Sequence, residues 1–459
     1  MSDLLIHYLL RYGSNVASIA IAGVAIWRCR RSRPSWAWPM AIALGLALIA
    51  RTYYDARSTP NWGHDFRFCW RAGSYSLEGK DPYTLRGLQP PHENESAFYY
   101  PPFMLPLFRI FVLVPEETAV RIWTAFNVLI SFVLGLMAWR ALIAQDRASN
   151  IIFQPWIAAL LSGPVILSLS ARFAIEAGQF SLLVTLALLG ALAAQRARPV
   201  VAAVCLVVAS IKVQTMFPFL LLFLRRDDLC TWILLGLFMA ALLLCSGDPA
   251  MLPERIQAFL SVHEASRQPG FTGDASLLNP KSHTMIGFDH ALSRLGVRDH
   301  SVEMPLNYLC MAALGICLGY VAISKPTLPR GALISFVSLY SMLFLYHRLY
   351  DLPILIIPLV YCGIRFSVTS GAIRWCYAAV LAAIIFALNV PYGEFYRIQG
   401  HYSQHPILTP LVLPSATYLI VLGMGALALA VGLEMRRGPS MHVLRENTST
   451  QSLGSIAKP

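Results

Sequence analysis

The chain has 459 residues, of which 56% are hydrophobic and only 13% are charged. Soluble globular proteins carry about twice that charged fraction, so the composition excludes an ordinary soluble enzyme and indicates a polytopic membrane protein. The formal net charge of +12 arises largely from arginines in short loops between apolar runs. This pattern is typical of a positive-inside bias and argues against nucleic-acid binding. Nine cysteines stand singly, as small core residues do, without the paired spacing of a zinc site or a disulfide framework.

Apolar runs recur along most of the chain. A spanning helix needs about 20 apolar residues, or fewer where neighbours cover its ends. We therefore expect an all-α polytopic membrane protein with a single integral domain over 1–434, followed by a disordered cytoplasmic tail over 435–459. The first run is followed by "RCRRSRP" and not by a small-residue cleavage site, which predicts a retained anchor. The runs lie near 4–27, 36–54, 118–143, 151–170, 179–195, 231–246, 304–323, 331–346, 352–364, 375–391 and 409–434.

The apolar stretch 199–224 lies between two basic segments, "QRARP" (195–199) and "RRDD" (225–228). Because cytoplasmic loops collect Lys and Arg, both ends of the stretch are expected on the cytoplasmic side. An even number of crossings satisfies this condition. We predict two short helices that turn near Lys212, with neighbouring helices shielding the turn from lipid. The count is then about 11 to 13 helices, thirteen if every run crosses, with the N-terminus outside.

Three long segments fall on the opposite, outer side: 55–117, 247–303 and 392–408. They are rich in Trp, Tyr, Phe and His. The first also contains "YYPPFMLPLF" (99–108), whose prolines favour a surface-lying or partly inserted segment over a clean span.

The presence of ionisable residues at the outer ends of the predicted helices requires an explanation, because burying a charge there costs free energy unless a partner or a water-filled cavity receives it. Asp65 lies in "WGHDFRFCWRAG" (62–73), where it fits either a site carboxylate or the cap of an interfacial helix. Lys212 stands among apolar residues and is suited to bind an anion. The turn "LYHRLYDLP" (345–353) brings together a histidine, an arginine and an aspartate, either as an ion-paired corner or as part of a site.

Two further places carry polar groups next to predicted spans. Glu176 and Gln179 precede a helix in "AIEAGQFSLL", where helix capping is the alternative role. Asn279, Lys281 and His283 in "DASLLNPKSH" are suited to bind hydroxyl groups, with loop solvation as the alternative. Since these groups all map to one outer face together with many aromatic rings, the pattern favours a site for a sugar phosphate: aromatic rings pack on sugar C–H faces, and Arg and Lys bind phosphate.

The order of these motifs resembles glycosyltransferase family 87, whose members have the GT-C fold and are similar to polyprenol-phosphate-mannose-dependent mannosyltransferases of bacterial envelopes. The similarity extends over most of 60–365, and each motif alone is loose. The motifs are "DFRFCWRAGSYSLEGKDPY", "YYPPFMLPLF", "GQFSLLVTLALLGALAAQR", "LVVASIKVQTMFPFLLLFLRR", "SLLNP" and "YHRLYDLPILIIPL".

The resemblance implies an enzyme of the bacterial cytoplasmic membrane with its active site facing the periplasm or cell exterior. It would move a sugar, by default mannose, from a polyprenyl-phosphate donor to a lipid or glycan acceptor. The family pattern implies Asp65 as general base and His347 as a second member of the active centre. Phe68, Cys69 and Trp70 depart from the usual aromatic cluster, which leaves the acceptor open. The expected phosphate-binding residues are Lys212, Arg348, Arg67 and Arg71, and the expected substrate-binding residues are Tyr100, Gln179, Asn279, Trp70 and Asp351.

The chemistry requires a base for the acceptor hydroxyl and cations for the departing phosphate, and a single displacement inverts the anomeric centre. We expect no metal and no cofactor. The main alternative is a lipid or solute transporter or flippase with a polar outer vestibule, but the sequence has no obvious internal repeat and its polar groups gather at one face. A third reading, a non-catalytic protein of an envelope assembly, predicts that Asp65→Asn is tolerated.

Overall fold

The fold is that of a computed structural model, which describes residues 62–84, 98–145, 167–268, 284–324, 328–390 and 414–437, apart from 196, 248, 298 and 299. It also describes a few isolated positions, among them Asn279. The predicted spans 4–27 and 36–54, most of 151–170, the outer segment 392–408, Lys281, His283 and the tail beyond 437 lie outside the described residues.

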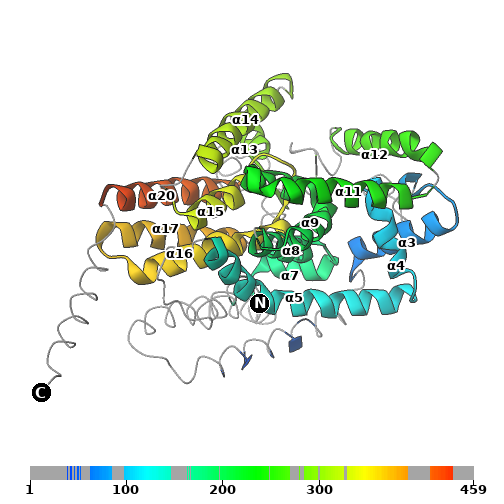
Figure 1. The fold of residues 1–459 in the computed structure, drawn as a ribbon, viewed down its shortest axis with the longest axis horizontal. Coiled ribbons are helices and arrows are strands. Elements are labelled where there is room, and N and C mark those ends of the chain that lie inside the picture. The colour runs from blue at the N-terminus through cyan, green and yellow to red at the C-terminus, as the bar shows by residue number, and fades with distance from the viewer. Residues whose placement is uncertain are drawn as a thin grey trace, which may run out of the picture.

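Long apolar helices dominate the described part of the chain, as the composition predicts. Seven of its helices are long and apolar enough to cross a membrane, or eight if the bent pair α7 and α8 is one span. Figure 1 shows α5, α11, α17 and α20 running along the long axis of the molecule. The principal helices are α5 (Glu116–Gln145), α7 (Leu169–Ala177), α8 (Ser181–Ala194), α9 (Pro199–Ala209), α10 (Val213–Phe219), α11 (Leu229–Cys245), α14 (His300–Ser324), α15 (Arg330–Ser341), α16 (Ile356–Val368), α17 (Gly371–Leu388) and α20 (Ser415–Arg437).

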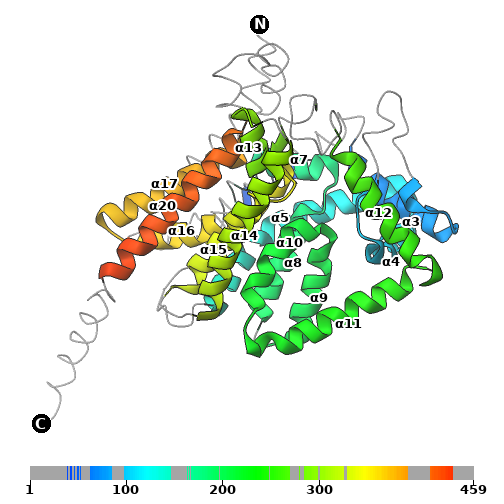
Figure 2. The same cartoon turned by 90° about the horizontal axis from the view of Figure 1, so that it is seen from above.

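Shorter elements cover one end of these helices, which we call the site end. In Figure 2, α3, α4, α7, α12 and α13 lie along one side of the molecule. Two short strands, β1 (Met285–Ile286) and β2 (His347–Arg348), pair antiparallel, with Ile286 opposite His347. The other short elements are α3 (His64–Leu77), η1 (Pro82–Thr84), η2 (Pro102–Met104), α4 (Leu105–Phe111), η6 (Pro249–Met251), α12 (Leu252–Ser266), α13 (Phe288–Arg294) and η8 (Leu349–Leu355).

The opposite end of the helices, which we call the basic end, is joined by a buried polar network. Gln195 donates hydrogen bonds to the Leu222 carbonyl at 2.8 Å and to Asp228 at 3.0 Å. Arg330 also donates to the Leu222 carbonyl, and Gln145 donates to Gln195. These bonds bring the last turns of α5 and α8 beside η4 (Leu220–Phe223), η5 (Arg226–Asp228) and the start of α15. Residues of three of the predicted cytoplasmic segments, 195–199, 225–228 and 325–331, thus meet at this end of the helices.

The segment 199–223 forms the predicted helical hairpin. Its length and composition suit a single span, but Lys212 contacts Ser181 at the start of α8, and Leu222 contacts Gln195 just after the end of α8. The chain therefore ascends through α9, turns in η3 (Ser210–Lys212) and descends through α10. Lys212 leaves the helical region of backbone space, with φ −116° and ψ 83°.

A sharp break separates α7 from α8, whose axes differ in direction by 109°. Gly178 ends α7 with φ 73°, a conformation that residues with a Cβ rarely adopt. Two side chains of α5 hold the break from outside: Trp123 donates to the Gly178 carbonyl at 3.0 Å, and Asn127 donates to the Gln179 carbonyl at 3.4 Å. This break points the start of α8 into the site end.

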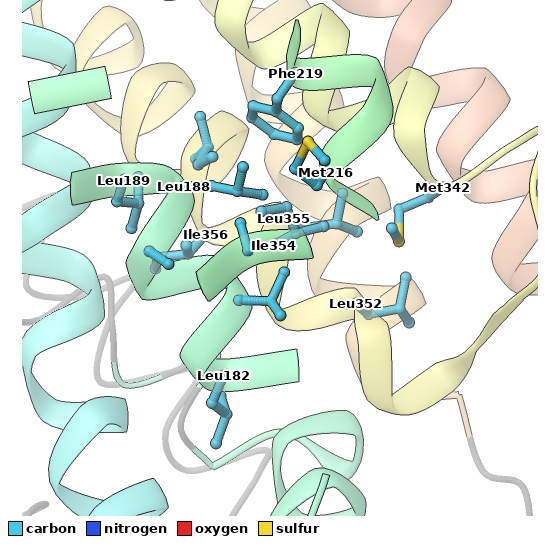
Figure 3. Packing of buried hydrophobic residues seen from close by; sticks show 14 of the residues in the cluster. Leu182, Leu188, Leu189, Met216, Phe219, Met342, Leu352, Ile354, Leu355 and Ile356 are labelled. Carbon is cyan, nitrogen blue, oxygen red and sulfur yellow. The ribbon is translucent and has the colours of Figure 1, made fainter. Parts of the chain in front are cut away.

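The core between these helices is continuous and apolar. Figure 3 shows Leu188 of α8 near Met216 and Phe219 of α10, with Ile354 to Ile356 beside them, while Leu182, Leu189 and Leu352 lie farther out in the same cluster. All of these side chains are buried. Since burial of apolar surface and close packing give the helices fixed relative positions, this core carries the polar groups of η3 and η8 at a constant spacing.

Two boundaries differ from the sequence-based expectation. The apolar run 331–346 is helical only to Ser341, because the chain then turns and enters β2. The last helix, α20, continues through Arg437, three residues into the expected tail. Its final turns are held by a salt bridge between Arg365 and Glu434, with 2.6 Å between Nη2 and Oε2.

Candidate active site

Asp65 lies in the first turn of α3, at the site end of the helices. The residue that caps α3 is Gly63, whose φ is 72°, and its N–H donates to the Glu176 carbonyl at 2.8 Å. The Asp65 carboxylate accepts a hydrogen bond from the Gln179 amide, which follows the α7–α8 break. His64 Nε2 lies 3.3 Å from the other carboxylate oxygen. Asp65 is therefore not the cap of its own helix. Its side chain stays 30% exposed and can meet a substrate.

Lys212 forms a buried ion pair with Asp351, with 2.5 Å between Nζ and Oδ1. Ser181 joins them: it accepts a hydrogen bond from Lys212 at 2.9 Å and donates one to Asp351 at 2.7 Å. The Lys212 ammonium also lies 4.5 Å from the centre of the Tyr350 ring. Both charged side chains are at most 6% exposed. A buried charge needs such compensation, so this cluster forms one electrostatic unit.

His347 is the third member of this unit. Its Nδ1 lies 3.4 Å from Asp351 Oδ2, and the same oxygen accepts the backbone N–H of Arg348 at 3.2 Å. The imidazole is completely buried, and its Nε2 has no hydrogen-bond partner among the described residues. Pairing of β2 with β1 positions the backbone at this point, because Ile286 lies opposite His347.

Arg348 lies close enough to Asp65 for the two charges to interact. Its Nε donates to the Tyr346 hydroxyl at 2.5 Å. Burial alone would lower the pKa of the guanidinium, but Tyr346, Tyr350 and Asp65 all act to raise it, and the net effect is upward. The arginine therefore remains a full positive charge within the field of the Asp65 carboxylate.

Tyr100 connects the Asp65 side of the site to the Asp351 side. Burial raises the pKa of its hydroxyl, and the nearby Cys69, Asp65, Tyr350 and Asp351 raise it further. The hydroxyl therefore stays protonated and can donate a hydrogen bond. The ring packs edge-on against Phe180, with 5.6 Å between centroids, and its backbone carbonyl accepts from Tyr83 at 2.7 Å.

Three of the expected site residues are engaged elsewhere. Arg67 and Arg71 both form salt bridges to Glu116, at 3.1 and 3.0 Å, and Arg67 also pairs with Glu117 at 2.6 Å. The indole N–H of Trp70 donates to the Val114 carbonyl at 3.0 Å. These bonds fasten α3 to the start of α5, so the three side chains have a structural role in this arrangement.

Asn279 is buried against β1, where its amide lies 3.6 Å from the Met285 sulfur. Two polar residues nearby, Ser181 and Asp289, have no sequence signal that marks them as site residues. Ser181 bridges Lys212 and Asp351, and Asp289 begins α13 close enough to His347 for the imidazole to lower the pKa of its carboxyl, although burial raises it overall. Neither residue lies in a short sequence motif that would identify it as part of a site. Ser181 is 170 residues from its partner Asp351, so only the fold reveals the contact.

Within the described ranges, no three His, Cys, Asp or Glu side chains are grouped so as to hold a metal ion. The arrangement combines a partly exposed carboxylate, a cation facing it and a buried ion-paired scaffold beneath them. Such a site can take a proton from a hydroxyl and stabilise a departing anion.

The fold and the site together define a polytopic membrane protein with a cluster of acidic and basic side chains at one end of its helices. The model of glycosyltransferase family 87 matches residues 98–346, which is more than half of the chain, and the protein belongs to that family. It is accordingly a membrane glycosyltransferase. A search of curated proteins found no match.

Proposed function

We propose that this glycosyltransferase transfers a sugar, mannose by default, from a polyprenyl-phosphate donor to a hydroxyl of a lipid or glycan acceptor. The proposal places the reaction at the outer face of the bacterial cytoplasmic membrane. The observation that carries it is the partly exposed Asp65 carboxylate, which is oriented by Gln179 and faced by the positive charge of Arg348.

In the proposed reaction, Asp65 removes the proton from the acceptor hydroxyl as its oxygen attacks the anomeric carbon. The bond between that carbon and the phosphate oxygen breaks, and the lipid phosphate leaves with the electron pair. Arg348 stabilises the charge that develops on the phosphate, since electrostatic stabilisation at the leaving group lowers the barrier. Attack from the opposite side inverts the anomeric centre, so a β-linked donor gives an α-linked product.

Lys212 and His347 have a different part in this proposal. Both bind Asp351 and are buried, so we assign them to positioning. They hold the turn that carries Arg348 and Tyr350 against the start of α8. Lys212 retains a third N–H, which supports a secondary contribution to phosphate binding once the turn is in place.

The orientation in the membrane is also part of the proposal. The arginine-rich segments gather at the basic end, and the positive-inside rule assigns that end to the cytoplasm. The site end then faces the periplasm or cell exterior. This side suits a donor carried on a lipid, because a lipid-linked sugar remains at the membrane surface without a soluble nucleotide carrier.

The test is mannosyl transfer by the purified protein in nanodiscs, with a short-chain polyprenyl-phosphate mannose as donor and a membrane-lipid extract as acceptor. Asp65→Asn keeps the shape of the side chain and its ability to accept from Gln179 but removes its basicity. We expect the transfer rate to fall by about 10²- to 10⁴-fold, the range for loss of a general base. Asp227→Asn, an exposed carboxylate at the basic end, serves as the matched control and should transfer normally.

Equal rates for wild type and Asp65→Asn would exclude Asp65 as the base. No transfer by the wild type from any lipid-phosphate sugar would overturn the proposed donor class.

A further inference from the structure

A groove between α8 and α9, bordered by α5, lies apart from the candidate active site. It has a volume of about 580 Å³, which is within the range of ligand-binding pockets. Its wall follows one face of α8 through positions 183, 186, 187, 190, 193 and 194, and one face of α9 through 201, 204, 205 and 208, with Ala197 of the connecting turn between them. Met137 of α5 closes one side.

Small residues give the groove its depth. Gly190 lets α9 approach α8 closely, because a Cβ there would lie 3.0 Å from Cys205 Sγ. The small side chains of Ala187, Ala193 and Ala194 leave space at the bottom of the groove. Ser181, at the start of the same helix, points toward Lys212 and Asp351. At 100° per residue the groove positions lie on the other side of α8, so this groove is not an extension of the candidate active site.

Among the lining residues that the structure describes, the charged one is Arg198, at the basic end of the groove. The side chain is exposed and makes no hydrogen bond or ion pair with the residues that the structure describes. It immediately precedes Pro199, the first residue of α9, so the guanidinium stands beside the positive end of the helix dipole. The groove thus combines an apolar trough about 17 Å long along α8, from 183 to 194 at 1.5 Å per residue, with a strong positive charge at one end.

We propose that this groove binds one anionic phospholipid, with its phosphate at Arg198 and one acyl chain between α8 and α9. Charge complementarity selects the occupant: basic pockets between membrane helices on the cytoplasmic side bind acidic headgroups, and each Arg or Lys near the surface contributes about 1 kcal/mol. An occupying lipid bridges α8, which begins at Ser181, and α9, which leads into η3 and Lys212. Lipid composition therefore acts on the stability of the helical hairpin, whichever sugar the enzyme transfers.

The test is native mass spectrometry of the detergent-purified protein titrated with phosphatidylglycerol or with phosphatidylcholine. We expect one tightly retained phosphatidylglycerol and weaker retention of the zwitterionic lipid. Arg198→Ala should weaken phosphatidylglycerol binding about fivefold, the equivalent of one surface arginine, and leave phosphatidylcholine unchanged. Arg226→Ala removes another exposed arginine at the basic end but outside the groove, and it should bind as the wild type does.

A second variant tests the trough itself. Ala193→Leu narrows the groove without altering its charge, and it should weaken retention of both lipids while the protein remains folded in thermal unfolding. Retention that is the same for both lipids and unchanged by Arg198→Ala would overturn the proposal, since it would indicate only a non-selective lipid shell. The proposal would also be overturned if a short-chain polyprenyl phosphate displaced phosphatidylglycerol and Arg198→Ala lost sugar transfer. The groove would then be a binding site for the donor.

Discussion

Lys212 and Asp351 show that the role of a charged side chain depends on the partner that the fold places beside it. A lysine among apolar residues predicts an anion site, and an aspartate four residues after a histidine predicts an ion-paired corner. In the fold they neutralise one another at 2.5 Å. Arg348 is a cation that interacts electrostatically with the Asp65 carboxylate, and this interaction favours Arg348 over Lys212 for the proposed phosphate contact.

This pairing makes a prediction about stability. Lys212→Met leaves the Asp351 charge buried without its main partner, and we expect the free energy of unfolding to fall by about 3–5 kcal/mol. The double variant Lys212→Met/Asp351→Leu should lose less than the sum of the two single variants. Unfolding by titration with SDS in mixed micelles gives the comparison. As a control, Lys80→Met breaks the exposed ion pair with Glu78 and should leave the free energy of unfolding unchanged. If the effects of the two single substitutions in the buried pair simply add in the double variant, Lys212 and Asp351 are not coupled.

At the scale of elements, the break between α7 and α8 carries Gln179 and Ser181 into the site. It depends on Gly178, whose φ of 73° favours glycine and whose missing Cβ makes room for Phe66. A Cβ there would lie 2.8 Å from Phe66 Cβ, and 3.1 Å from Gly63 Cα. The orientation of Asp65 therefore depends on two glycines that face each other across α3 and α7.

Gly178→Ala and Gly79→Ala form a matched pair that separates strain from packing. Both positions have a φ of 73°, but a Cβ at Gly79 meets nothing within 4 Å. We expect Gly79→Ala to destabilise the protein by about 1–2 kcal/mol through backbone strain alone. Gly178→Ala should cost a further 1–3 kcal/mol or so through overpacking, and it should also lower the transfer rate by displacing Gln179. Equal effects of the two substitutions on both stability and rate would contradict this account.

At the scale of the whole molecule, the described helix ends sort into two groups. Arg225 donates to the Ala322 carbonyl at the basic end, and Ser170 donates to the Leu388 carbonyl at the site end. These contacts join segments 97 and 218 residues apart. Both contacts are those expected if successive helices in the described part of the chain run alternately toward the basic end and toward the site end.

The absolute orientation gives a further prediction. In a variant with its nine cysteines replaced by alanine, we expect Lys80→Cys to react with a membrane-impermeant maleimide in intact spheroplasts. Arg226→Cys should react only after the membrane is opened, because the basic end is expected in the cytoplasm. Both positions are exposed, so each should label fully in detergent. Labelling of Arg226→Cys before permeabilisation would reverse the proposed orientation.

The sequence by itself determined the class of fold and the hairpin around Lys212, because hydropathy and loop charge depend on the bilayer and not on tertiary detail. The family resemblance rests on the order of its motifs. It also singled out Asp65, Gln179, Lys212 and Asp351, since charged and polar groups are rare in such a chain. Only the tertiary structure decided which of them are partners. Ser181 acts through a contact 170 residues away, and Arg67 and Arg71 are bound by Glu116. Those pairings result from the packing of distant helices, which local patterns of residue type do not encode.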